Sequence, residues 1–255
     1  MSGSRRWAAG SVVVAALAAA ALAADTAAAA NAERALAASA GGDARLSAVP
    51  GAYIAGFPFA QVAVTGKVPR VSVSALDAEV DGLGVVNASA EAFEVKVAPE
   101  RAAAGDFSGS RASMVRRNVR LDGVAFGALL GMTDLDISHP YDISPGGGPA
   151  SEAQLRGTVP GTDSPSTVVV TLRLTDGIFS MRPSLLVDTP EGEEDEILAA
   201  YTLDRDTRDL PLGGPADLVQ LSGGSIEFSR QRLNTTLGGD DLLPLSPPAP
   251  SAPAG

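Results

Sequence analysis

The sequence predicts an α+β protein in which most strands pair antiparallel and two or three short helices accompany them. Three observations predict this class. Apolar and polar residues alternate with period two over much of residues 49–97, which is typical of half-buried strands. Asp176-Gly177 separates two apolar runs, the pattern of a tight hairpin. Gly223-Gly224 separates a second such pair near the C-terminus.

The first two predicted strands are long, and their apolar parity changes without an intervening turn. The first has apolar positions at Val71, Val73 and Ala75, and then at Leu76, Ala78 and Val80. The second passes in the same way from Val86, Ala88, Ala90 and Ala92 to Phe93, Val95 and Val97. A change of parity inside a strand predicts a β-bulge, which bends the strand and increases its twist. These strands therefore predict a strongly curved sheet.

The other elements are shorter. Residues 113–123 alternate as a strand and "TDLDIS" (133–138) as another, whereas "VAFGALLGM" (124–132) is typical of a short helix. Acidic residues open the segment 191–203 and apolar residues follow, as a helix N-terminus prefers. Residues 31–40 are expected to form a further short helix that Gly41-Gly42 ends.

Both ends of the 255-residue chain differ from this domain. Arg5 and Arg6 precede an uncharged apolar stretch and small-residue cleavage sites after Ala28 or Ala30, so residues 1–30 are predicted to be a signal peptide. The stretch is also about long enough for a membrane anchor, which needs roughly 20 residues. Because it is mostly Ala, cleavage is favoured. Residues 244–255 are predicted to be a disordered Pro-rich tail, which leaves residues 31–243 as one domain.

Composition narrows the classes of function. The chain has no Cys, so disulfides, thiolate metal sites and acylated Cys anchors are excluded. The formal net charge of −11 argues against nucleic acid as a partner, because phosphate binding needs a basic face. It does not argue against lipid, whose tails can be held by burial alone.

The sequence contains few of the patterns typical of catalytic sites. The chain lacks a G-x-S-x-G elbow, an H-E-x-x-H pair and a P-loop. The lone His139 and the glycine-rich "SPGGGPA" (144–150) are interpreted as loop residues, and "EGEEDE" (191–196) as a solvated helix start rather than a calcium site. We therefore predict no enzyme, metal or cofactor, although the many carboxylates leave a hydrolase with an acidic pair open.

Two groups of residues are candidates for binding. Pro58 does not belong inside a central strand, so Phe57 and Phe59 are expected to point inward from a turn, either filling a core corner or lining a slot for acyl chains. Arg116 and Arg120 lie on one face of the 113–123 strand, in the main basic cluster that follows the N-terminal segment. They are either solvated or contacts for a phospholipid headgroup, because guanidinium pairs well with phosphate.

The segment "IAGFPFAQVAVTGKVPRVSVSA" resembles the opening of the LmeA family of phospholipid-binding proteins of the actinobacterial cell envelope. Segments 124–161 and 207–237 are similar to the middle and closing strands of that family. The resemblance implies a curved sheet wrapped on one or two helices, like tubular lipid-binding folds, with acyl chains in an apolar cavity. Its candidate lining residues are Phe57, Pro58, Phe59, Val71, Val73, Phe93 and Val95, with Arg116 and Arg120 for the headgroup.

Two main functions follow as expectations. The first is an exported phospholipid-binding or lipid-transfer protein of a periplasm-like space or the cell envelope, which the resemblance links to maturation of a lipomannan-type glycolipid. The second is a non-enzymatic scaffold that stabilises a membrane glycosyltransferase. The expected partners are a phospholipid or glycolipid, the membrane surface and that glycosyltransferase.

Overall fold

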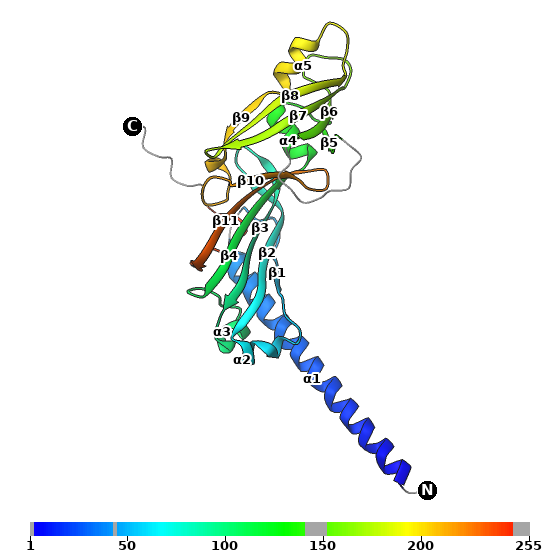
Figure 1. Cartoon of the computed structure of the whole chain (residues 1–255), viewed down its shortest axis with the longest axis vertical. Coiled ribbons are helices and arrows are strands. Elements are labelled where there is room, and N and C mark those ends of the chain that lie inside the picture. The colour runs from blue at the N-terminus through cyan, green and yellow to red at the C-terminus, as the bar shows by residue number, and fades with distance from the viewer. Residues whose placement is uncertain (1–2, 43–44, 141–151, 247–255) are drawn as a thin grey trace.

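A computed structural model describes residues 3–42, 45–140 and 152–246. Its strands form two separate antiparallel sheets (Figure 1). The six-stranded sheet has the order β1-β2-β3-β4-β11-β10. These strands are β1 (Gly51–Ile54), β2 (Lys67–Val80), β3 (Gly84–Lys96), β4 (Arg111–Leu121), β11 (Ile226–Thr236) and β10 (Leu218–Leu221).

The five-stranded sheet is a meander in which each strand pairs with the next in sequence. Its strands are β5 (Asp136–Ser138), β6 (Glu152–Gly157), β7 (Ser166–Thr175), β8 (Ile178–Asp188) and β9 (Leu203–Asp206). The β7–β8 hairpin turns at Asp176-Gly177, and both residues have positive φ, as a type I′ turn requires. The Gly223-Gly224 hairpin also forms, between β10 and β11. The two hairpin predictions are therefore confirmed, and the α+β class with them.

One face of the six-stranded sheet is covered by the long helix α1 (Gly3–Ala40) over the half that contains the start of β2 (Figure 1). Ala32, Leu36 and Ala40 recur every four residues on α1 and are buried against Val71, Val73, Val95 and neighbouring apolar side chains of the sheet. The helix ends at Ala40, before Gly41-Gly42, as predicted. It differs from the prediction in having no break between the apolar N-terminal stretch and residues 31–40.

The other half of the same sheet contributes to a second core with the five-stranded sheet. This core contains Phe126 of α4 (Gly123–Leu130), Phe179 of β8 and Phe228 of β11, whose rings meet edge to face. Asp122 caps α4, because its side chain accepts a hydrogen bond from the N–H of Ala125 (2.9 Å). Five short helices complete the fold: η1 (Phe59–Gln61), α2 (Val62–Thr65), α3 (Pro99–Ala103), α5 (Glu194–Ala200) and η2 (Thr207–Asp209).

The long strands bend where the sequence predicts, although two side chains face other ways than expected. The β2–β3 register shifts between Ala75 and Ala78, so a bulge is present and Ala78 is buried, but Leu76 lies in the bulge and is 69% exposed. In β3 the parity changes at Glu94, whose φ is +49°. Phe93 precedes this change and therefore lies on the outer face, half-buried, instead of beside Val95.

Two further expectations concern the number of sheets and the C-terminal boundary of the domain. The sequence predicts one curved sheet, whereas residues 136–206 form a sheet of their own. At the C-terminus, Leu245 is 1% exposed in the core, so residues 244–246 pack against the domain. Residues 247–255 and the predicted "SPGGGPA" loop lie outside the described residues.

Candidate functional site

The Phe57-Pro58-Phe59 step lies in the turn between β1 and η1, at the end of the domain where α1 leaves it (Figure 1). The two aromatic rings point in different directions. Phe59 is 7% exposed and joins the core under α1, whereas Phe57 is 73% exposed. The expectation that both point inward is therefore wrong for Phe57, because Pro58 turns the chain and leaves Phe57 on its outer side.

Val71, Val73 and Val95 lie under α1, as expected for a helix wrapped by a sheet. All three are completely buried and pack against α1 and the segment that follows β11. Their role in lipid binding remains a prediction, because they line none of the three cavities described below.

Arg116 and Arg120 lie on the outer face of β4 and already have partners within the protein. The guanidinium of Arg116 stacks over the ring of Phe93, 5.2 Å from its centroid. The Nη2 atom of Arg120 lies 3.0 Å from the Glu227 carboxylate and 3.1 Å from the Ser222 hydroxyl. A phosphate would have to compete with these partners for either arginine.

A cavity of about 340 Å³ opens beside α1, between the helix and the segments that precede β4 and follow β11. Such a volume lies at the lower end of the range usual for small-molecule sites. Ser39 and Leu36 of α1, the 104–108 loop and the 237–243 segment line it. Leu237, Leu242 and Leu243 supply much of its apolar wall, with Phe107. This is the described cavity whose lining best suits an acyl chain.

The 237–243 segment is held in place by a partly buried charge cluster of Arg117, Arg232 and Asp241. Burial raises the pKa of the Asp241 carboxyl. Hydrogen bonds from the Arg232 guanidinium and the Gly238 N–H (2.8 Å) outweigh that effect, so the net pKa is below its usual value. Arg117 lies 4.0 Å from the same carboxylate and is 7% exposed. Its side chain also donates to the backbone carbonyls of Leu212 (3.5 Å) and Asp240, which closes the wall of the adjoining cavity of about 240 Å³.

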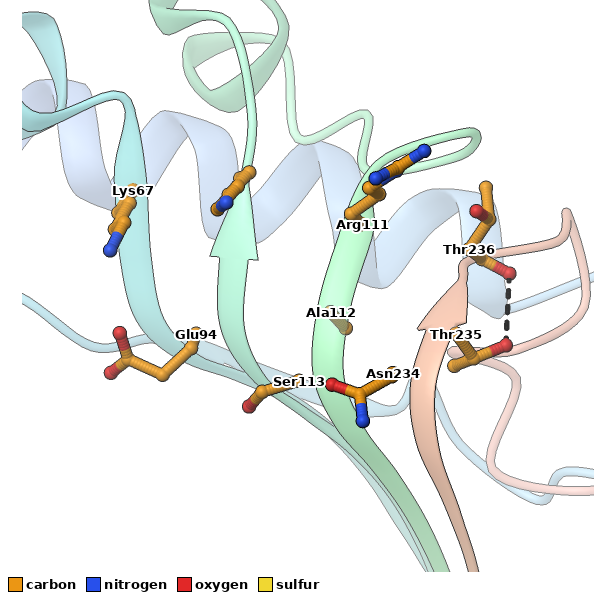
Figure 2. A pocket seen from close by; sticks show the side chains of 9 residues that line it. Lys67, Glu94, Arg111, Ala112, Ser113, Asn234, Thr235 and Thr236 are labelled. Atoms are coloured by element: carbon orange, nitrogen blue, oxygen red, sulfur yellow. Dashed lines mark hydrogen bonds between the residues drawn. The ribbon is translucent and has the colours of Figure 1, made fainter.

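A larger groove, of about 560 Å³, lies across the ends of β2, β3, β4 and β11 (Figure 2). Lys67, Lys96 and Arg111 line it with Glu94, and Ser113, Asn234, Thr235 and Thr236 add hydroxyl and amide groups. The three cations are exposed, whereas Val68, Val95 and Ala112 beside them in sequence are buried under α1. The alternation places the cations on the side of the sheet away from the helix.

Sequence reasoning missed this basic row, because its members are far apart in the chain. The one signal available was that each cation is the first or last residue of a strand. Strand register, which brings them together, cannot be read from alternation alone.

Comparison with known proteins gives one match. The family model described as LmeA-like phospholipid-binding matches residues 23–229, most of the chain. The chain belongs to this family. The match to the LmeA-like family begins inside α1, so the last part of the helix is counted with the domain and not apart from it. No curated protein and no solved structure matches the LmeA-like chain.

Proposed function

We propose that this LmeA-like chain is an exported, non-enzymatic phospholipid-binding protein of the cell envelope, which α1 tethers to the membrane. The cavity beside α1 carries this proposal. Its leucines offer an apolar surface to acyl chains, and burying one methylene contributes about 0.8 kcal/mol. Several methylenes could therefore hold a lipid without any charged contact to its headgroup.

The tether is supported by the way α1 joins the domain. Among the described residues, Val12–Ala40 is the helix long and apolar enough to cross a membrane, a property that signal sequences share. The Asp25 carboxylate accepts hydrogen bonds from the N–H groups of Phe59 (2.7 Å) and Ala60 (2.6 Å). Glu33 accepts one from Ile54 (3.0 Å). Cleavage after Ala28 or Ala30 would remove the Asp25 contacts, so we infer that the segment is retained as an anchor.

Lipid transfer and support of lipomannan-type glycolipid maturation are finer proposals. They follow from the resemblance to the family, and a membrane-held domain that takes up lipid is compatible with both. The competing function is a scaffold for a membrane glycosyltransferase, which would need no lipid in the cavity.

Native mass spectrometry of the full chain, released from neutral detergent micelles that contain phospholipid, tests the proposal. We expect phospholipid adducts on the wild type. Ser39→Phe, which fills the cavity, should reduce them at least fivefold. Ala38→Phe makes the same kind of change on an exposed part of α1 outside the cavity and should leave them unchanged. A wild type free of lipid would overturn the proposal and favour the scaffold.

A further inference from the structure

We propose that Lys67, Lys96 and Arg111 form a binding site for the phosphate of an anionic lipid headgroup at the membrane surface. The inference rests on the proposed function and adds the headgroup class that the protein selects.

The three cations form a row across neighbouring strands. Lys67 pairs directly with Lys96, and Lys96 pairs with Arg111. Side chains at directly opposite positions have Cβ atoms about 5 Å apart, and like charges there destabilise a sheet. A bound anion would remove that repulsion, because each cation could then face a phosphate oxygen instead of only another cation.

Lys67, Lys96 and Arg111 lie on the side of the six-stranded sheet away from α1, and their charges have no partner among the described residues. Elsewhere on the face, Arg120 pairs with Glu227, Arg70 lies 3.6 Å from Glu91 and Arg116 stacks on Phe93. Across the described part of the chain, none of the ion pairs involves a side chain of the row. Three solvated cations side by side are therefore available to an outside ligand.

The groove around the row has the chemistry of a phosphate site. Three cations against the single carboxylate of Glu94 leave a formal charge of +2 in a protein whose net charge is −11. Ser113, Asn234, Thr235 and Thr236 contribute further hydrogen-bonding groups from β4 and β11 (Figure 2). The local excess of positive charge favours a net anionic headgroup over a zwitterionic one.

The position of the groove favours a membrane lipid as the source of the phosphate. Lys67 follows Gly66, the residue that ends α2, and Val64 of α2 is 90% exposed. Phe57 is exposed in the preceding turn, next to the residues that Asp25 of α1 contacts. Exposed apolar side chains, basic residues and the exit of an apolar helix thus share one end of the domain, as expected of a surface that meets a bilayer.

The groove also adjoins the acyl cavity. Thr236 lines the groove and the next residue, Leu237, lines the cavity. The N–H of Leu237 donates to the carbonyl of Ser110 (2.8 Å), next to Arg111. The neighbouring ends of β4 and β11 therefore lie between a site for a headgroup and a site for tails.

The test compares lipid classes on the full chain. Neutral detergent micelles with equimolar phosphatidylglycerol and phosphatidylcholine present both headgroups, and native mass spectrometry reads the ratio of the two adducts. The wild type should favour phosphatidylglycerol. A basic residue near a membrane surface contributes about fivefold to anionic lipid binding, so the triple variant K67Q/K96Q/R111Q should lower the ratio at least tenfold. R173Q, at an exposed arginine of β7, is the single-charge control. K67Q alone should lower the ratio of the two adducts more than R173Q does.

Each result has a defined meaning. An unchanged ratio in the triple variant, with both lipids still bound, would overturn the headgroup site and leave the proposed function intact. Loss of all adducts from the wild type would overturn the proposed function itself. In a parallel titration, soluble glycerol 3-phosphate should bind only weakly; tight binding that the triple variant abolishes, with an unchanged lipid ratio, would assign the row to a free phosphate ester instead. A thermal midpoint at or above that of the wild type, as expected when the repulsion between the three cations is removed, shows that the triple variant folds.

Discussion

The carboxylate of Asp25 accepts a hydrogen bond from the backbone N–H of Phe59, with 2.7 Å between Oδ2 and N. The Oδ1 atom accepts a second bond from Ala60. One side chain of α1 thus holds the start of η1, next to the Phe57-Pro58 turn.

Replacing Asp25 by Ala should therefore destabilise the domain. We expect a loss of about 1–2 kcal/mol in the free energy of unfolding, because two backbone donors lose a charged acceptor at a partly exposed site. Thermal unfolding of the full chain in neutral detergent measures it. Asp163→Ala, at an exposed loop position, is the control and should have no effect. Equal stability of the two variants would mean that α1 is not docked at residue 25.

Gly105 allows the loop between α3 and β4 to pack closely against α1. A Cβ atom here would lie 2.5 Å from the carbonyl oxygen of Ala32 and 2.8 Å from the nitrogen of Leu36, and φ is +68°. We expect Gly105→Ala to destabilise the protein by about 3 kcal/mol or more and to raise hydrogen exchange in residues 32–40.

Gly109 gives a matched control for this prediction. Its φ is +69°, but its nearest neighbour would be the Nη1 atom of Arg101 at 3.9 Å. Gly109→Ala should therefore cost only the backbone term of about 1–2 kcal/mol. If both variants lose the same stability in urea unfolding, the close approach of Gly105 to α1 contributes nothing.

Asp241 should make the stability of the protein depend on pH. Its folded pKa is lower than its unfolded value, so its contribution is complete above the unfolded value of about 3.9 and disappears as pH falls through the folded pKa. We expect Asp241→Asn to lose about 1–2 kcal/mol at pH 7, and the difference from wild type to shrink below about pH 4. Urea unfolding between pH 3 and 7 measures this.

The neighbouring Asp240 is the control, because its side chain is exposed and only its backbone carbonyl contacts Arg117. Asp240→Asn should leave the pH profile of the wild type unchanged. A difference between Asp241→Asn and wild type that stays constant from pH 7 to pH 3 would contradict the assignment.

The same substitution should destabilise the protein strongly at Phe59 and hardly at all at Phe57. Phe59→Asp places a carboxylate in the core under α1 and should cost at least about 3 kcal/mol. Phe57→Asp changes an exposed ring and should stay within about 0.5 kcal/mol. Phe107, at 2% exposure, should behave like Phe59. Similar melting of the Phe57 and Phe59 variants would contradict their placement.

Alternation and turn chemistry predicted much of the fold, because both act locally. The β7–β8 and β10–β11 hairpins and the bulge between Ala75 and Ala78 follow from residue spacing alone. The division into two sheets does not follow from residue spacing, because alternation indicates a strand but not the strand with which it pairs. Val168 and Val71 present similar patterns, yet they lie in different sheets.

The candidate site was less predictable than the fold. Apolar parity correctly placed Val71 and Val95 inside, and correctly put Arg116 and Arg120 on one face. The ion pair of Arg120 depends on Glu227, which lies 107 residues away, so no local pattern could reveal it. The acyl cavity likewise depends on the docking of residues 237–243 against α1.

The unbroken course of α1 has a mechanical consequence. As the proposed anchor, a helix that runs from Gly3 to Ala40 without a hinge would couple the domain rigidly to the bilayer. The distance of the lipid site from the membrane and its orientation would then be set by the depth and tilt of the helix in the bilayer. Such a protein would bind and release lipid at a fixed distance from the membrane. A second lipid carrier would be needed for transport over any longer distance.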